Sequence, residues 1–325
     1  MSVSDAREQP AAQPQKKRMS RGTRVLVIIV CVLLAIALIL VATVLILSAV
    51  GRSALTNDDG MNIARDDVEA LGSGTVRYDG QLYRYNTDIV TILLMGVDEE
   101  VKQDADGVYG NANQSDANIL AVLDLRNQEM TLISVSRDTM CDIAILGESG
   151  DVSGSARAQL ALSYSYGDGL ATSAALTREA VSNLFYGLDI DGYAAFYMGG
   201  IADLNDALGG VTLTVQSDYP FTNLPGCSNL VSGREVTLTG RQARAYIQAR
   251  HETTTGNEER MQRQKQYLLA MISQARQLIS GNPTKAVSLY NAVSDYVLSD
   301  LDLSKISYLC LLYTSDAADD TPCVD

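Results

Sequence analysis

The stretch "IVTILLMGV", residues 89–97, decides the fold of this chain. It is a continuous apolar run that is rich in β-branched residues. Such runs are typical of strands that are buried on both faces of a sheet. The stretch therefore predicts a central strand in a sheet that is covered by helices.

The next segments of the chain extend this prediction to a whole domain. "NILAVLDL" (118–125) and "EMTLISVS" (129–136) read as two strands, and the short connection between them predicts an antiparallel hairpin. Further along, helices and strands alternate: a helix at 172–187, a strand at 192–198, a helix at 199–210, a strand at 211–215 and mainly helical sequence at 238–297. The predicted fold class is α/β, with one domain over residues 89–309 and helices packed on a central mixed sheet.

The N-terminal part of the chain predicts a membrane anchor. Residues 25–51 carry no charge, and at about 1.5 Å per residue they are long enough to cross a hydrocarbon core of about 30 Å. A cleaved signal peptide is the alternative, but its apolar region is only about 7–15 residues long. Basic residues precede the segment and Asp58 and Asp59 follow it, which predicts a cytoplasmic N-terminus.

These features predict a single-pass cell-membrane protein whose main domain is extracytoplasmic. Residues 1–24 are expected to form a disordered cytoplasmic tail and residues 52–88 a juxtamembrane spacer. Within the spacer, "ARDDVEALGSG" (64–74) predicts a helix that ends at glycine. Residues 310–325 are similar to the translation of a sequencing adapter, so we expect a non-native tail there.

Charge and cysteine content limit the possible functions. The chain has 39 acidic and 25 basic residues and a formal charge of −14, which disfavours binding to nucleic acid. An anionic ligand then needs a local group of arginines or a metal ion. Cys141 and Cys227 are the cysteines of the globular part, and their spacing leaves a disulfide and two separate thiols equally open.

Charged residues lie at the ends of the predicted strands. Asp98 follows the first strand, Asp116 precedes the second, and Arg137 and Asp138 follow the third. If the second and third strands are antiparallel, these residues meet at one sheet edge, where a hard divalent cation would stabilise facing carboxylates. The alternative is that the aspartates only cap strand and helix ends.

A second polar cluster lies on the late helix. Arg260, Arg263 and Gln264 project from one side of it, and Arg250 precedes it. One guanidinium group can donate two parallel hydrogen bonds to two oxygens of a phosphate, so the cluster predicts an anion-binding site. The alternative is a solvated helix face.

The motifs "ILLMGVD", "SDANILAVLDLRNQEMTLISVSRDT", "YAAFYMGGIADLNDALGGV" and "LTGRQARAYIQARH" occur in an order that resembles the LytR-CpsA-Psr family. The resemblance covers about residues 89–279. It implies a phosphotransferase that moves a glycopolymer from a polyprenyl pyrophosphate carrier onto peptidoglycan. It also implies that the protein works at the membrane with Mg²⁺ as cofactor.

The resemblance assigns roles residue by residue. It implies Asp98 and Asp116 as magnesium ligands and Arg137, Arg250, Arg260 and Gln264 as pyrophosphate-binding residues, with Arg263 beside them. Arg137 and Asp138 are the expected catalytic residues, and Asp138 either acts as the base or orients Arg137. Three positions depart from the family pattern, because Gln248, Gln114 and Cys141 stand where arginine is found or frequent.

Two alternatives to the phosphotransferase stay open at this point. A hydrolase would use water on the same lipid pyrophosphate, and a non-catalytic anchored receptor would only bind lipid-linked glycan.

A polyprenyl tail also needs an apolar groove. We expect this groove between the sheet and helices such as the one at 172–187.

Overall fold

The structure is a computed structural model, and it describes residues 42–55, 68–72, 75–84, 86, 88–102, 108–216, 219–251, 256–282, 284–302, 304–306 and 308–309. The chain divides into two compact units, residues 1–46 and 47–325. The predicted cytoplasmic tail, most of the predicted membrane helix and the predicted non-native tail lie outside the described residues. Within the described ranges, no helix combines the length and apolarity that crossing a bilayer requires.

The centre of the larger unit is a mixed five-stranded sheet in the order β12-β9-β4-β5-β6. β4 and β5 are antiparallel, β5 and β6 are antiparallel, and β4 and β9 are parallel. The predicted central strand and hairpin are therefore confirmed. The strand bounds are β4 Ile89–Val97, β5 Ser115–Asp124, β6 Glu129–Val135, β9 Gly192–Tyr197 and β12 Val297–Ser299.

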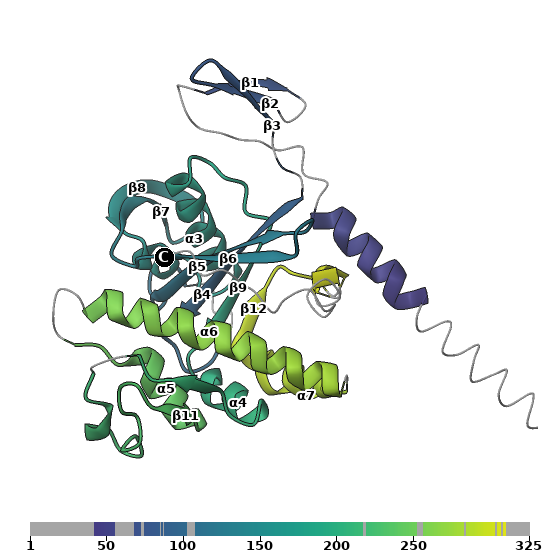
Figure 1. Cartoon of the computed structure of the whole chain (residues 1–325). Helices are drawn as coiled ribbons and strands as arrows, with labels where there is room; N and C mark the ends of the chain where they lie inside the picture. The colour runs from purple at the N-terminus through teal and green to yellow at the C-terminus, as the bar shows by residue number, and fades with distance from the viewer. Residues whose placement is uncertain are drawn as a thin grey trace, which may run out of the picture. The chain divides into compact units, whose positions relative to one another are not determined.

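Helices pack on both faces of this sheet (Figure 1). On one face, residues of α2 and α3 share a core with β4, β9 and β7, the first strand of a separate hairpin. On the other face, α6 lies over β5 and β6, and α4 and α5 adjoin it. The bounds are α2 Ala161–Ser165, α3 Ala171–Leu184, β7 Met140–Leu146, β8 Val152–Gln159, α4 Gly200–Ala207, α5 Gly240–Gln248 and α6 Gly256–Gly281.

Several further elements are short. They are β10 Thr212–Thr214 and β11 Glu235–Thr237, which pair with each other, the 3-10 turns Phe221–Asn223 and Ser294–Tyr296, and α7 Lys285–Val293. α5 begins with a capping box, in which the side chains of Thr239 and Gln242 each bind the other residue's backbone N–H. This cap fixes the start of the helix that leads to Arg250.

The prediction of a helix at residues 64–74 is wrong. β1 (Val68–Gly72) pairs with β2 (Thr75–Tyr78), which pairs in turn with β3 (Gln81–Arg84). The β2–β3 turn is Asp79–Gly80, with φ of 47° and 74°, which is the conformation that two-residue hairpins require. Hydrogen bonding to a neighbouring strand overrides the local helical preference.

The two cysteines lie in separate cores. Cys141 packs with β4 and α3, whereas Cys227 packs with α4 and α5, and neither forms a disulfide with another described residue. Burial raises the pKa of both thiols. The open question of pairing is thus resolved in favour of two protonated, structural thiols.

Candidate active site

The charged residues at the strand ends meet at one edge of the sheet. Because β4–β5 and β5–β6 are both antiparallel, the end of β4, the start of β5 and the end of β6 coincide. Val97 pairs with Ser115, and Asn118 pairs with Val135. This topology is the one under which the sequence predicts convergence of Asp116 and Arg137.

Asp116 occupies an irregularity in the strand pairing. Gly96 pairs with Ala117 and Val97 with Ser115, so Asp116 is an extra residue in β5. Bulges of this kind redirect a side chain, and they occur often beside active sites. The Asp116 carboxylate accepts a hydrogen bond from Arg137 Nη1 on Oδ1 and one from Arg260 Nη1 on Oδ2, the latter at 3.0 Å.

Arg260 and Arg137 bring more positive charge to this edge than Asp116 neutralises. The Arg260 side chain is only 5% exposed. Burial lowers the pKa of Arg260, and although Asp116 opposes this effect, the charges of Arg137 and Arg250 add to it. The Nε atoms of Arg137 and Arg260 are buried, and neither has a hydrogen-bond partner within the described chain. Buried donors without partners are costly, so the arrangement favours an anionic ligand.

Asp138 and Asn257 extend the cluster. Asp138 Oδ1 lies 3.6 Å from Arg137 Nε, and Oδ2 accepts a 2.6 Å hydrogen bond from Asn257 Nδ2. Asn257 Oδ1 accepts a 2.8 Å bond from Arg260 Nη2. Asn257 is not among the site residues predicted from the sequence, although it stands three residues before Arg260, a spacing that places the two side chains together on a helix.

Asp98 and Asp116 are chemically suited to a magnesium ion. Asp98 is exposed just beyond β4, and its backbone N–H donates to Gln114 O at 3.0 Å, which holds it beside the start of β5. Each Asp116 oxygen accepts one guanidinium N–H and keeps a further lone pair. Among the described residues, no group of three metal-ligating side chains occurs. The oxygen donors present thus fit a cation whose other ligands come from substrate or water.

The structure separates the predicted phosphate-binding residues into two groups. Arg250 is exposed, and it lies near enough to Arg260 to affect its pKa. The Arg263 side chain is instead buried in the core, where Nε donates to Tyr246 O at 2.9 Å and Nη2 donates to Ala249 O. Gln264 donates to Ile247 O at 3.2 Å. Arg263 and Gln264 therefore fix the end of α5, next to Arg250.

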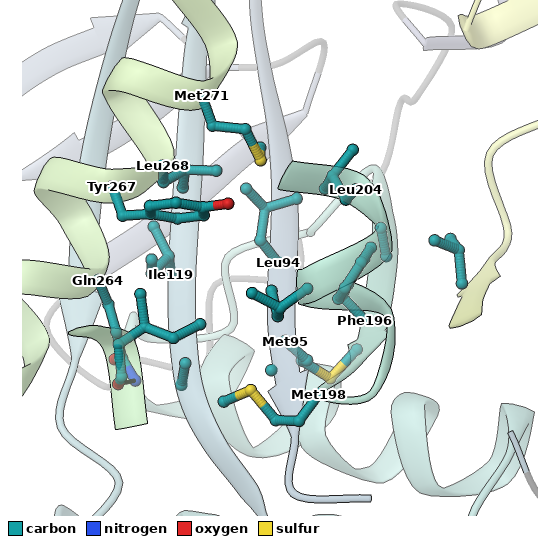
Figure 2. Close-up of a pocket in the computed structure, with 16 residues that line it drawn as sticks. Leu94, Met95, Ile119, Phe196, Met198, Leu204, Gln264, Tyr267, Leu268 and Met271 are labelled. Atoms are coloured by element: carbon teal, nitrogen blue, oxygen red, sulfur yellow. Dashed lines mark hydrogen bonds between the residues drawn. The ribbon is translucent and has the colours of Figure 1, made fainter. Parts of the chain in front are cut away.

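An apolar cavity of about 240 Å³ lies between α6 and the sheet (Figure 2). It adjoins the arginine cluster of Arg137, Arg250 and Arg260 through two lining residues. Ala117, next to Asp116, is part of its wall, as is Gln264 of α6. Its other lining residues are almost all apolar and come mainly from β4, β5, β9, β12, α4, α5 and α6, among them Leu94, Ile119, Phe196, Leu204, Leu268 and Met271.

The sequence predicts the groove at the helix 172–187. α3 packs on the opposite face of the sheet, and the cavity of about 330 Å³ that its residues line includes the charged side chains of Arg178, Glu179 and Asp189, so the apolar cavity at α6 is the better match to a polyprenyl tail.

The fold and the site together indicate the kind of ligand that the protein binds. An apolar cavity beside buried arginines, at the edge of an α/β sheet, suits an amphiphile with an anionic head. The model of the LytR_cpsA_psr family matches residues 56–320, so this chain belongs to that family.

Sequence and structure comparisons with named proteins agree with this family assignment. The chain is 27% identical over 307 residues to the polyisoprenyl-teichoic acid–peptidoglycan teichoic acid transferase TagU of Enterococcus faecalis, with 91% of this chain and 86% of that protein aligned. The protein of the same name from Oceanobacillus iheyensis is 32% identical over 236 residues, which cover 72% of this chain and 65% of that protein. Among solved structures, B. subtilis TagV superposes with a TM-score of 0.53 at 25% identity, covering 71% of this chain and 81% of that one.

Proposed function

We propose that this protein is a phosphotransferase that moves a glycopolymer from a polyprenyl pyrophosphate carrier onto peptidoglycan. Family membership and the activity named for the relatives support this function. The observation that carries it is the juxtaposition of Arg137 and Arg260, each with a buried Nε that makes no hydrogen bond to a described residue, and an apolar cavity whose wall includes Ala117. A polyprenyl pyrophosphate has the matching parts, an anionic head and an apolar tail.

The proposed reaction exchanges one bond at phosphorus. A hydroxyl oxygen of the acceptor attacks the phosphorus that bears the glycan, and the bond from that phosphorus to the bridging oxygen breaks. Polyprenyl phosphate leaves with the electron pair, and the glycan phosphate stays on the acceptor as a phosphodiester. Charge on the phosphate oxygens grows in the transition state, so Arg137, Arg260 and Arg250 serve to neutralise it.

Asp138 is the proposed proton acceptor for the attacking hydroxyl. Its side chain is 44% exposed, whereas that of Asp116 is 13% exposed and lies between two arginines. A base must come within hydrogen-bond reach of the hydroxyl, and only Asp138 of this pair offers an open carboxylate. Asp116 would instead orient Arg137 and Arg260.

Magnesium is part of the proposal. Asp98 and Asp116 would hold Mg²⁺, which supplies further neutralisation of the pyrophosphate charge when it is bound. The Asp98 side chain is exposed, so its replacement disturbs no core. In Asp98→Asn we expect a higher Mg²⁺ concentration for half-maximal transfer, whereas Glu129→Gln, at the far end of the sheet, should leave the titration unchanged. Equal Mg²⁺ curves for all three proteins would remove Asp98 from the site.

The proposed location completes the function. A membrane helix at residues 25–51, with the N-terminus in the cytoplasm, would keep the domain outside the cell and beside its lipid-linked substrate. Protease treatment of intact cells that carry the full chain tests this orientation. Degradation of the domain is expected, and complete protection would contradict it.

One assay separates the proposed function from its alternatives. The full chain is incubated with a polyprenyl-pyrophosphate-linked glycan, Mg²⁺ and peptidoglycan, and the glycan products are followed. A glycan–peptidoglycan conjugate is the expected product. Free glycan phosphate alone would indicate a hydrolase, and unchanged lipid-linked glycan that stays bound would indicate a receptor.

A further inference from the structure

Five side chains at the sheet edge form a closed ring. Asp116 accepts from Arg137, and Arg137 Nε lies 3.6 Å from Asp138. Asp138 accepts from Asn257 at 2.6 Å, Asn257 accepts from Arg260 at 2.8 Å, and Arg260 donates back to Asp116 at 3.0 Å. Both guanidinium groups are thus held from two sides, and Asn257 is the only uncharged member.

Asn257 also ties together two segments that are far apart in the sequence. It stands on the first turn of α6, and its Nδ2 lies 3.3 Å from the hydroxyl of Ser136, which directly precedes Arg137. The start of α6 is itself fixed closely, because a Cβ on Gly256 would stand 2.1 Å from His251 O. Asn257 therefore joins a fixed helix start to the turn that carries Arg137 and Asp138.

The ring needs an amide at this position. Asn257 donates to a carboxylate on one side and accepts from a guanidinium on the other, and a primary amide carries both functions. An ionised aspartate would accept from Arg260 but would repel Asp138. An alanine would leave Asp138 and Arg260 without their mutual link.

We propose that Asn257 is a positioning residue of this site, which holds Arg260 in the geometry that receives a diphosphate group and Asp138 in the geometry that receives the attacking hydroxyl. The role rests on the proposed function, since the diphosphate would be the head of the lipid carrier. Asn257 itself need not touch the substrate. It limits the motion of the two groups that do, and small displacements of such groups lower rates strongly.

The test measures diphosphate binding separately from transfer. Methylene diphosphonate, a diphosphate that cannot be hydrolysed, is titrated into the full-length protein with Mg²⁺ by calorimetry. In Asn257→Ala we expect affinity about 10- to 100-fold weaker, the usual effect of losing hydrogen bonds to charged groups. Gln262→Glu, on an exposed position of the same helix, should bind as the wild type does.

A second variant gives a signature that lost stability would not produce. In Asn257→Asp the new carboxylate faces Asp138, with Arg260 and Arg137 as the other charged neighbours, and the acidic pair favours uptake of a shared proton. The protonated pair restores a donor to the ring. The affinity of Asn257→Asp relative to wild type should therefore rise as the pH falls from about 8 to about 6, whereas the ratio for Asn257→Ala stays flat.

The outcomes separate this inference from the proposed function. An acidic residue suits a helix N-terminus, so Asn257→Asp should melt at the wild-type temperature even if Asn257→Ala fails to fold. Wild-type affinity in both variants would overturn the positioning role, and so would a wild-type protein that binds no diphosphonate. If binding depends on Asn257 but no conjugate forms, the positioning role stands and the transferase function fails.

Discussion

The two faces of the central sheet differ in how their polar groups are satisfied. On the face covered by α2 and α3, the hydroxyls of Tyr164 and Tyr197 both donate to Gly169 O, at 3.0 and 2.8 Å, inside the core, where Asn118 Oδ1 is a buried atom without a hydrogen-bond partner among the described residues. The face covered by α6 holds a cavity of about 240 Å³ next to the buried Nε atoms of Arg137 and Arg260, which make no hydrogen bond within the described part of the chain. Hydroxyls that are hydrogen-bonded in a core stabilise the fold, whereas guanidinium donors without a hydrogen bond beside a cavity suit a ligand.

The largest effect is expected at the arginine cluster. Arg137→Ala should reduce transfer by about 100- to 1,000-fold, the usual result of removing one donor to a developing charge. Arg126→Ala is the matched control, because Arg126 is 77% exposed and pairs with Asp88 at the other end of the sheet. Initial rates and melting temperatures are compared. Retained transfer in a folded Arg137→Ala protein would show that this face does not carry the reaction.

Neighbouring alanines on β9 allow the two faces to be compared directly. Ala194 lines the cavity, whereas Ala195 is fully buried in the opposite core. Ala194→Met should fill part of the cavity and weaken transfer from the lipid substrate, with little change in stability. Ala195→Met should overpack the core and lower the free energy of unfolding by about 1–3 kcal/mol.

The measurements are urea unfolding and the KM for the lipid-linked glycan. Methylene diphosphonate binding serves as a further control, since the head-group site is intact in both variants. The comparison of faces fails if Ala194→Met is the less stable protein and keeps the wild-type KM.

Features that depend on strand order are predicted well by the sequence. The apolar run at 89–97 and the short connection at 126–128 imply neighbouring antiparallel strands, and these bring Asp116 beside Arg137. The relatives' names agree with the function that the motifs imply. The strand at 68–72 could not be predicted, because pairing with the neighbouring strand, and not the local composition, determines the secondary structure of these residues.

Side-chain direction is the part that the sequence leaves open. Helical spacing places Arg260 and Arg263 on one side of α6, yet Arg260 turns to Asp116 while Arg263 turns to the carbonyls of Tyr246 and Ala249. The bulge that redirects Asp116 also has no sequence signal. Both depend on how α5, α6 and the sheet pack, which no local pattern records.

A smaller effect is expected from the face covered by α2 and α3. Tyr197→Phe removes a hydroxyl that donates to Gly169 O at 2.8 Å and lies 3.1 Å from the Tyr164 hydroxyl. Gly169 O keeps its bond from Tyr164, so we expect a loss of about 1 kcal/mol in the free energy of unfolding. Transfer should be unchanged, and denaturant unfolding with parallel rate measurements checks both. A loss of transfer without a loss of stability would assign a role in the reaction to this face.

The smallest effect concerns alkaline pH. Burial raises the pKa of Tyr164 and Tyr197, so the folded protein keeps these protons at a pH where the unfolded chain releases them. The unfolded chain then binds fewer protons, and stability falls as the pH rises above about 10, the ordinary tyrosine value. Below that pH these groups cause no change. Tyr197→Phe should show a shallower loss between about pH 10 and 11, because one of the groups that causes the dependence is absent, and an equal slope would contradict this origin.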